Sequence, residues 1–171
     1  AEMLKLDFRE KFVLDVGSST GGFTDYALRH GARKVYAVDV GTDQLHPSLR
    51  RHPKIELHEK TDIRDFYVKQ APDIVVIDVS FISLRDILPH IHEHLSDTHT
   101  QVVAMVKPQF EAGKDQTNKG IIKNDSVRRQ ILKDFEFWSK DRFVIIDKRD
   151  SDVAGAKGNQ ERFYLLQPKA V

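Results

Sequence analysis

The sequence is 171 residues long and 40% hydrophobic, and its 27 basic and 26 acidic residues give a formal net charge of +1. This length predicts one domain, residues 1–171, with a single hydrophobic core. The absence of cysteine excludes disulfides and thiolate metal sites, and no apolar run is long enough to span a bilayer, so we expect a cytoplasmic protein that does not insert into membranes. The balanced charge neither favours nor excludes a nucleic-acid partner, because such binding depends on a local patch.

Short apolar strands alternate with helices along the chain. We predict strands at 11–16, 34–40, 54–59, 73–80, 101–107, 142–149 and 161–168, and helices at 21–30, 42–51, 83–95 and 125–138. Most of these strands are apolar throughout, which is typical of strands buried in a parallel sheet. The pattern predicts a doubly wound α/β fold with seven strands, in which a hairpin joins the last two strands and one of them runs antiparallel. Residues 108–125 form the longest segment without a predicted element, and loops of that length are usually functional or mobile.

The first strand runs into a glycine-rich turn that begins at Asp15 and continues as “VGSSTGGF”. Such a turn at the carboxyl end of a strand lets the backbone approach a ligand closely, and the next helix points its N-terminal amides at the same crevice. We therefore expect a nucleotide-like cofactor to bind here. The residues predicted to contact it are Gly17, Ser18, Ser19, Thr20, Gly21, Gly22 and Phe23. The alternative is that Gly21 and Gly22 only allow the helix to pack closely on the sheet.

Acidic residues at the strand ends indicate the kind of cofactor. Asp39, followed by Val40, is placed to accept hydrogen bonds from ribose hydroxyls. Asp15 would lie unfavourably near a pyrophosphate but suits the ammonium of a methionine group. Ser19 also stands where dinucleotide-binding loops carry their second glycine. The pattern favours S-adenosylmethionine and disfavours NAD without excluding it.

Three further strand ends open onto the same crevice. Asp62 is positioned to meet the exocyclic amine of an adenine, while Ile63 packs on its ring. Asp78 lies at the end of the fourth strand and Lys107 at the end of the fifth, and ligands of such sheets bind outside the carboxyl ends of the parallel strands. Asp78 and Lys107 form either an ion pair that holds two strand ends together or a proton-transfer pair, and the residues alone leave both interpretations open.

Five longer segments follow one another in the chain: “LDVGSSTGGFTD”, “KVYAVDVGTDQL”, “DVSFISL”, “VKPQFEAGK…KGII” and “GAKGNQERFYLL”. Together they resemble the hemolysin A (TlyA) family of ribosomal RNA 2′-O-methyltransferases, whose catalytic domain is similar to that of the FtsJ methyltransferases. The resemblance covers about residues 11–167. It implies a Rossmann-like methyltransferase fold, S-adenosylmethionine as cofactor, cytidine ribose as target, and ribosomal RNA or ribosomal subunits as partner. It also implies an S4-like RNA-binding domain upstream, so we expect this chain to be a fragment.

The resemblance further implies a catalytic Lys-Asp-Lys-Glu set. Asp78, Lys107 and Glu161 match its last three members, and the first lysine belongs to a segment upstream of the first strand. A ribose 2′-hydroxyl is a poor nucleophile until its proton is removed, so the enzyme must supply a base and alignment. Lys107 is the candidate base. We assign Asp78 to orienting Lys107 beside the cofactor sulfonium, and Glu161 to holding the lysine or the ribose.

Two surface features lie outside this predicted set. Five basic residues around the segment 108–125 either track RNA phosphates or form an ordinary solvated surface. They are Lys114, Lys119, Lys123, Arg128 and Arg129. His90 and His94 share a helix face, but no carboxylate or cysteine completes a ligand set, so we expect no metal.

Two other functional classes are alternatives to an enzyme. One is a cofactor-binding module without activity, and the other is a secreted pore former of the hemolysin type. The presence of Asp78, Lys107 and Glu161 together favours an enzyme over an inert module. The sequence shows neither an amphipathic membrane helix nor a secretion signal, which disfavours the pore former.

Overall fold

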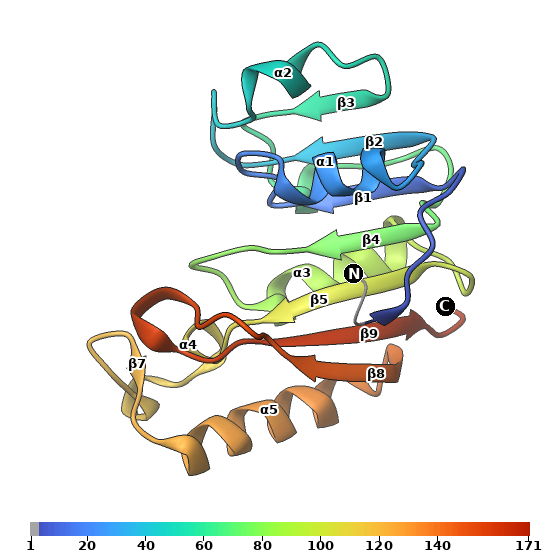
Figure 1. The fold of residues 1–171 in the computed structure, drawn as a ribbon. Coiled ribbons are helices and arrows are strands. Elements are labelled where there is room, and N and C mark those ends of the chain that lie inside the picture. The colour runs from blue at the N-terminus through green and yellow to red at the C-terminus, as the bar shows by residue number, and fades with distance from the viewer. Residues whose placement is uncertain (1–3) are drawn as a thin grey trace.

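A computed structural model describes residues 4–171. Its main strands are β1 (Phe12–Val16), β2 (Lys34–Val38), β3 (Ile55–His58), β4 (Ile74–Ile77), β5 (Gln101–Val106), β8 (Phe143–Asp150) and β9 (Arg162–Pro168). They form a seven-stranded sheet in the order β3-β2-β1-β4-β5-β9-β8 (Figure 1). β1 to β5 pair in parallel, whereas β9 runs antiparallel to both β5 and β8. The predicted α/β fold, with its C-terminal hairpin and antiparallel strand, is confirmed.

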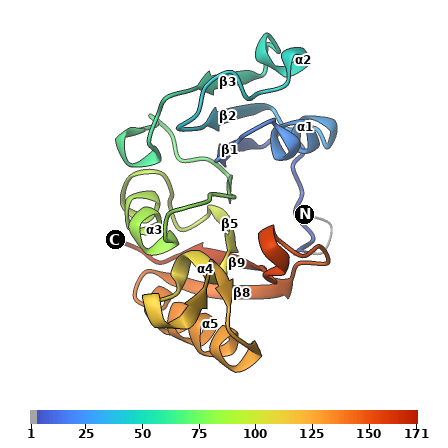
Figure 2. The ribbon, with the colours of Figure 1, turned by 90° about the vertical axis from the view of Figure 1, so that its left-hand side faces the viewer.

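Helices cover both faces of this sheet. The α-helices are α1 (Gly22–Arg29), α2 (Pro47–Arg50), α3 (Leu84–His94), α4 (Pro108–Glu111) and α5 (Asp125–Ser139). The shorter elements are the 3-10 turns η2 (Ile63–Asp65), η3 (Lys114–Gln116) and η4 (Ala156–Gly158) and a small hairpin of β6 (Thr117–Asn118) and β7 (Ile121–Ile122). Figure 2 looks onto the carboxyl ends of β1 to β5 and shows α3 and α1 on opposite faces of the sheet.

The larger core lies between the sheet and the helices α3 and α5. Leu14, Ile77, Leu88 and Phe135 are fully buried there. On the other face, α1 and the segment before β1 cover a smaller cluster that includes Val35. Because both faces of the central strands are covered, their residues are apolar in succession and do not alternate with polar ones.

Two predicted segments differ from the structure. The helix predicted over 42–51 is reduced to the four residues of α2, because Pro47 opens it and His46 caps it from an extended conformation. The segment 108–125, predicted as a loop, contains α4, η3 and the β6–β7 hairpin. Elements of two to four residues are too short to show a hydrophobic period, so the sequence pattern does not reveal them.

Candidate active site at the carboxyl ends of the strands

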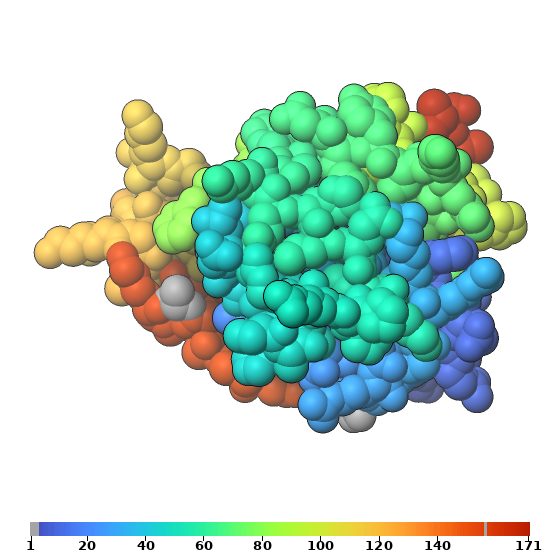
Figure 3. All heavy atoms as spheres, turned by 90° about the horizontal axis from the view of Figure 1, so that it is seen from above, coloured from blue at the N-terminus to red at the C-terminus, as the bar shows by residue number. Residues whose placement is uncertain are grey.

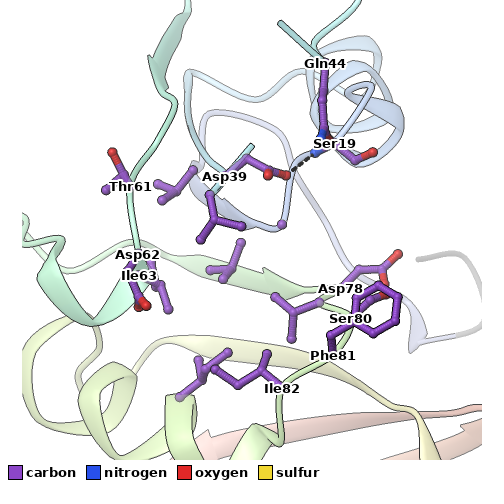
Figure 4. A pocket seen from close by; sticks show the side chains of 16 residues that line it. Ser19, Asp39, Gln44, Thr61, Asp62, Ile63, Asp78, Ser80, Phe81 and Ile82 are labelled. Atoms are coloured by element: carbon purple, nitrogen blue, oxygen red, sulfur yellow. Dashed lines mark hydrogen bonds between the residues drawn. The ribbon is translucent and has the colours of Figure 1, made fainter. Parts of the chain in front are cut away.

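A cavity of about 340 Å³ opens where β1, β2 and β4 end (Figure 4). Figure 4 shows Asp62 and Ile63 at one side of it, and Asp78, Ser80 and Phe81 at the other. Many of the residues predicted to bind the cofactor line this cavity. They are Gly17, Ser19, Asp39, Val40, Asp62, Ile63 and Asp78.

A second hollow of about 380 Å³ lies beside the glycine loop and the start of α1. It shares Gly17, Ser19 and Asp78 with the first cavity, so one extended ligand can occupy both. The other predicted residues in its lining are Ser18, Thr20, Gly22 and Phe23. Gly21 and Asp15 line neither space.

The glycines of the loop have different tasks. Gly17 has a φ of 79°, and a Cβ there would overlap the carbonyl oxygen of Asp78, so only glycine fits this turn at the cavity wall. Gly21 has a φ of 99°, and a side chain there would collide with leucines at α2. Gly21 thus allows close contact with Leu45 and Leu49, which is a different contact from the helix-to-sheet packing of the alternative interpretation. Gly22 borders the second hollow, and a Cβ added there would meet no atom within 4 Å.

Asp15 lies beneath the glycine loop. Its side chain is 1% exposed, its Oδ2 accepts a hydrogen bond from Thr24 Oγ1 at 2.7 Å, and burial raises its pKa to about 6. Among the described residues, its Oδ1 and the buried hydroxyl of Ser18 have no hydrogen-bond partner. Buried polar atoms without partners are rare in folded proteins. Ser18 lines the second hollow, so its hydroxyl suits a ligand that brings a polar group to the glycine loop, whereas Asp15, which was predicted to contact the cofactor, faces Thr24 beneath the loop.

Asp39 joins the glycine loop to the turn after β2. Its Oδ2 accepts a hydrogen bond from the backbone N–H of Ser19 at 2.8 Å, which Figure 4 shows as a dashed line, and its Oδ1 accepts one from Gly41 at 2.7 Å. A carboxylate oxygen can accept more than one hydrogen bond. Asp39 is therefore held rigidly at the cavity wall with capacity left for two hydroxyl groups of a ribose.

Asp62 has a partner that the sequence interpretation missed. Its carboxylate accepts a hydrogen bond from the Arg64 backbone N–H at 2.9 Å and pairs with the Arg64 guanidinium at 2.6 Å. The bond from Arg64 lowers the pKa of Asp62 to about 2. An adenine amine at this end of the cavity thus meets a carboxylate that is already paired, while Ile63, 5% exposed, offers an apolar surface.

The three predicted catalytic side chains converge. Lys107 Nζ lies 2.7 Å from Asp78 Oδ1 and donates to Ser80 Oγ at 3.0 Å. Glu161 is 8% exposed just before β9. Burial raises the pKa of Glu161. The positive charge of nearby Lys107 and a hydrogen bond from Gln109 act in the opposite direction and lower this pKa, but burial has the larger effect. The contact between Asp78 and Lys107, which the ion-pair and the proton-transfer interpretations both require, is present.

An aromatic pair at the mouth of the cavity was not found from the sequence. Phe81 is 90% exposed, has a φ of 66° and lines the cavity, and its ring centroid lies 5.2 Å from that of Phe110. A large apolar side chain on a left-handed backbone is uncommon. The sequence does contain a pattern that points to this pair, because an aromatic residue stands three positions after each of Asp78 and Lys107.

The basic residues near the site do not act as one set. Arg128, one of the candidates for RNA contact, is 8% exposed, and its guanidinium donates to Asp150 Oδ1 at 2.7 Å and to the Gln160 carbonyl at 3.0 Å. Arg129 pairs with Asp125 on the same helix. Lys114, Lys119 and Lys123 are exposed. They belong to the segment whose yellow and orange side chains project from the body in Figure 3.

Within residues 4–171, no cluster of three or more histidine, cysteine or acidic side chains has the arrangement of a metal site. No helix in the same part of the chain is long and apolar enough to cross a membrane.

Comparison with known proteins decides the family. Residues 1–168 match the family described as FtsJ-like methyltransferase. The chain belongs to the FtsJ-like methyltransferase family. This result and the parallel sheet with its antiparallel C-terminal strand confirm the predicted methyltransferase fold.

Relatives of this FtsJ-like chain carry two kinds of name. It is 40% identical over 162 residues to the 23S rRNA (cytidine-2′-O)-methyltransferase TlyA of Campylobacter jejuni, covering 93% of this chain and 63% of the relative. It is 39% identical to hemolysin A of Brachyspira hyodysenteriae, covering 91% and 67%. A solved structure from Streptococcus thermophilus, described as a hemolysin, has a TM-score of 0.93 and 38% identity, covering 98% of this chain and 62% of that one. The resemblance to the hemolysin A (TlyA) family is confirmed, and the chain spans about 63–67% of the length of these two curated relatives.

Proposed function

We propose that this chain is the catalytic part of an enzyme that uses S-adenosylmethionine to methylate the ribose 2′-hydroxyl of a cytidine in ribosomal RNA. The convergence of Asp78, Lys107 and Glu161 beside a cofactor-sized cavity carries the proposal. The C. jejuni relative, named for the same reaction, supports it. A module that only bound the cofactor would not require a lysine between two carboxylates at the mouth of the cavity.

The residues around the glycine loop suit the cofactor. When bound, S-adenosylmethionine supplies a methyl group on a sulfonium. Asp39 would accept hydrogen bonds from the ribose hydroxyls, Ile63 would contact the adenine ring, and the backbone at Gly17 would lie against the ligand. The unpartnered Ser18 hydroxyl, at the lining of the second hollow, would receive the amino-acid end.

Lys107, as the neutral amine, is the basic group that takes the proton of the ribose hydroxyl. Asp78 and Ser80 both contact Nζ and thereby fix its direction at the cavity mouth. Glu161 lies close enough for the Lys107 charge to affect its carboxyl group. The chain's own contribution is thus a positioned base, and correct orientation can lower a barrier by roughly 7–11 kcal/mol in favourable cases.

The partner and the location follow from this reaction. Ribosomal RNA or ribosomal subunits would be the substrate, and the cytoplasm would be the place of action. The exposed Lys114, Lys119 and Lys123 lie on the segment that follows α4 and would neutralise RNA phosphates.

Cofactor choice is the first test. Titration calorimetry should show that S-adenosylmethionine and its demethylated product bind, and that NAD does not, because Ser19 and the buried Asp15 disfavour a pyrophosphate at the loop. Methyl transfer from labelled cofactor to ribosomal subunits tests the reaction itself. Preferential binding of NAD would contradict the cofactor assignment, and binding without any transfer by a chain extended to the length of the TlyA relatives would favour the inert module.

Phe81 should contact the base of the target nucleotide. Phe81→Ala should lower single-turnover transfer by about 10-fold or more, because stacking of a base on an aromatic ring contributes ~1–3 kcal/mol. Phe81→Tyr keeps the ring and should remain close to wild type. Phe137→Ala is the matched control, since Phe137 is 80% exposed on α5, away from the cavity lining. Equal rates for Phe81→Ala and the control would remove Phe81 from the substrate site.

A further inference from the structure

Two loops face each other across the mouth of the cavity. Residues 78–83 follow β4 and residues 107–111 follow β5. At the strand ends they meet through the ion pair of Asp78 and Lys107, at 2.7 Å. Further out, the phenylalanine rings of the two loops lie 5.2 Å apart. These contacts alone would leave the outer ends of both loops unattached to each other.

Glu111, the last residue of α4, makes the outer attachment. Its Oε1 accepts a hydrogen bond from the Leu84 backbone N–H at 2.7 Å, and its Oε2 accepts one from Ser83 Oγ at 2.6 Å. Ser83 is the N-cap of α3 and Leu84 its first residue, so the carboxylate lies at the positive end of that helix. Arg85 Nε stands 3.8 Å from the same carboxylate.

This carboxylate is withdrawn from solvent and from both cavities. The Glu111 side chain is 1% exposed and lines neither hollow, so it is not placed to touch a ligand there. Burial raises its pKa, while the hydrogen bonds from Ser83 and Leu84 act in the opposite direction. A buried acidic group destabilises the fold unless hydrogen bonds satisfy it. Here the donors are Ser83 and Leu84, at the end of the loop that begins with Asp78.

We propose that Glu111 is a positioning residue, which holds the two loops at the separation at which Asp78 meets Lys107. This inference rests on the methyl transfer proposed above. α4 connects to all three catalytic side chains. Lys107 is its N-cap residue, and its Gln109 forms a hydrogen bond with Glu161. Its Glu111 accepts a hydrogen bond from Ser83, in the loop that begins with Asp78. The short helix therefore acts as a brace between β4, β5 and β9.

Three variants test the brace. Glu111→Ala removes both hydrogen bonds. Glu111→Gln keeps them, because the amide oxygen still accepts from Leu84 N–H and the amide nitrogen can donate to the Ser83 hydroxyl. Asp115→Asn is the control, since Asp115 is exposed four residues further along the chain. Each is compared with wild type by hydrogen exchange of the amides of residues 79–86 and by single-turnover transfer at saturating cofactor and RNA.

We expect the amides of residues 79–86 to exchange at least about 10-fold faster in Glu111→Ala, without change in the β1 and β2 amides, and the transfer rate at saturating RNA to fall at least about 30-fold. Glu111→Gln and Asp115→Asn should stay within about 3-fold of wild type on both measurements. Unchanged exchange in Glu111→Ala, or faster exchange with an undiminished rate, would overturn the brace. A chain extended to the length of the TlyA relatives that transfers no methyl group to RNA would instead refute the proposed function, and the exchange measurement would then decide the brace by itself.

Discussion

In a chain extended to the length of the TlyA relatives, replacing Lys107 by alanine should lower 2′-O-methylation by about 10²–10⁴-fold, the usual contribution of a general base, while cofactor affinity stays within a few-fold of wild type. Lys107 does not line the cofactor cavity, and its Nζ reaches the mouth through Asp78 and Ser80. Removing it therefore takes away the base and leaves the residues that bind the cofactor. Single-turnover transfer and calorimetry on the same preparation separate the two effects.

Two matched variants sharpen this test. Lys107→Arg retains a positive charge beside Asp78 but cannot lose its proton in a protein, so it should be as inactive as the alanine variant. Lys133→Ala removes an exposed lysine of α5 outside the cavity and should leave the rate near wild type. Wild-type turnover in Lys107→Ala, or activity rescued by arginine, would show that Lys107 only pairs with Asp78 and is not the base.

The location of the site could be predicted because of the topology of the sheet. Asp39, Asp78 and Lys107 each directly follow or end a buried apolar strand, and parallel strands place their carboxyl ends at one edge. Strand type is clear in the sequence because β1, β2, β4 and β5 are mostly apolar and do not alternate with polar residues. Position along a strand therefore determined which residues meet, without any knowledge of their side-chain conformations.

The partners of individual side chains could not be predicted in this way. Asp62 is bound by Arg64 because the chain enters a 3-10 turn just after it, and three residues show no periodic pattern. Arg128 was assigned to the surface from its charge. It is buried because α5 packs on the C-terminal hairpin, where Asp150 satisfies the guanidinium across 22 residues of sequence. Local pattern carries no information about such a pair.

Asp15 and Phe81 show the same limit at the cavity. Both residues lie close to the carboxyl end of a predicted strand. Asp15 nevertheless points beneath the glycine loop toward Thr24, whereas Phe81 is exposed to solvent at the mouth of the cavity. Successive side chains along a strand point to opposite faces of the sheet. A residue one position further along the strand can therefore face the core where its neighbour faces the ligand. The edge is predictable from sequence, but the depth of each side chain depends on the turn that follows.

Replacing Asp39 by alanine should weaken S-adenosylmethionine binding by about 100-fold or more. A hydrogen bond to a charged group contributes ~1.5–3 kcal/mol, and about 1.4 kcal/mol corresponds to a factor of ten in affinity. The alanine variant loses the acceptor for the ribose hydroxyls. It also frees the backbone N–H groups of Ser19 and Gly41, so the glycine loop is no longer tied to the turn after β2. Calorimetry with the cofactor and with its demethylated product measures the loss.

The Asn variant tests whether both carboxylate oxygens of Asp39 are needed. Asp39→Asn keeps one oxygen, but its amide nitrogen would face a backbone N–H donor, so one of the two ties breaks and the affinity should fall nearly as far as with alanine. Asp65→Ala removes an exposed carboxylate of η2 outside the cavity lining and should bind like wild type. Thermal unfolding of each variant checks that the sheet is intact. If Asp39→Ala bound the cofactor within about 3-fold of wild type while folded, Asp39 would be a structural tie between two turns, and the ribose would have to be held by another residue of the cavity.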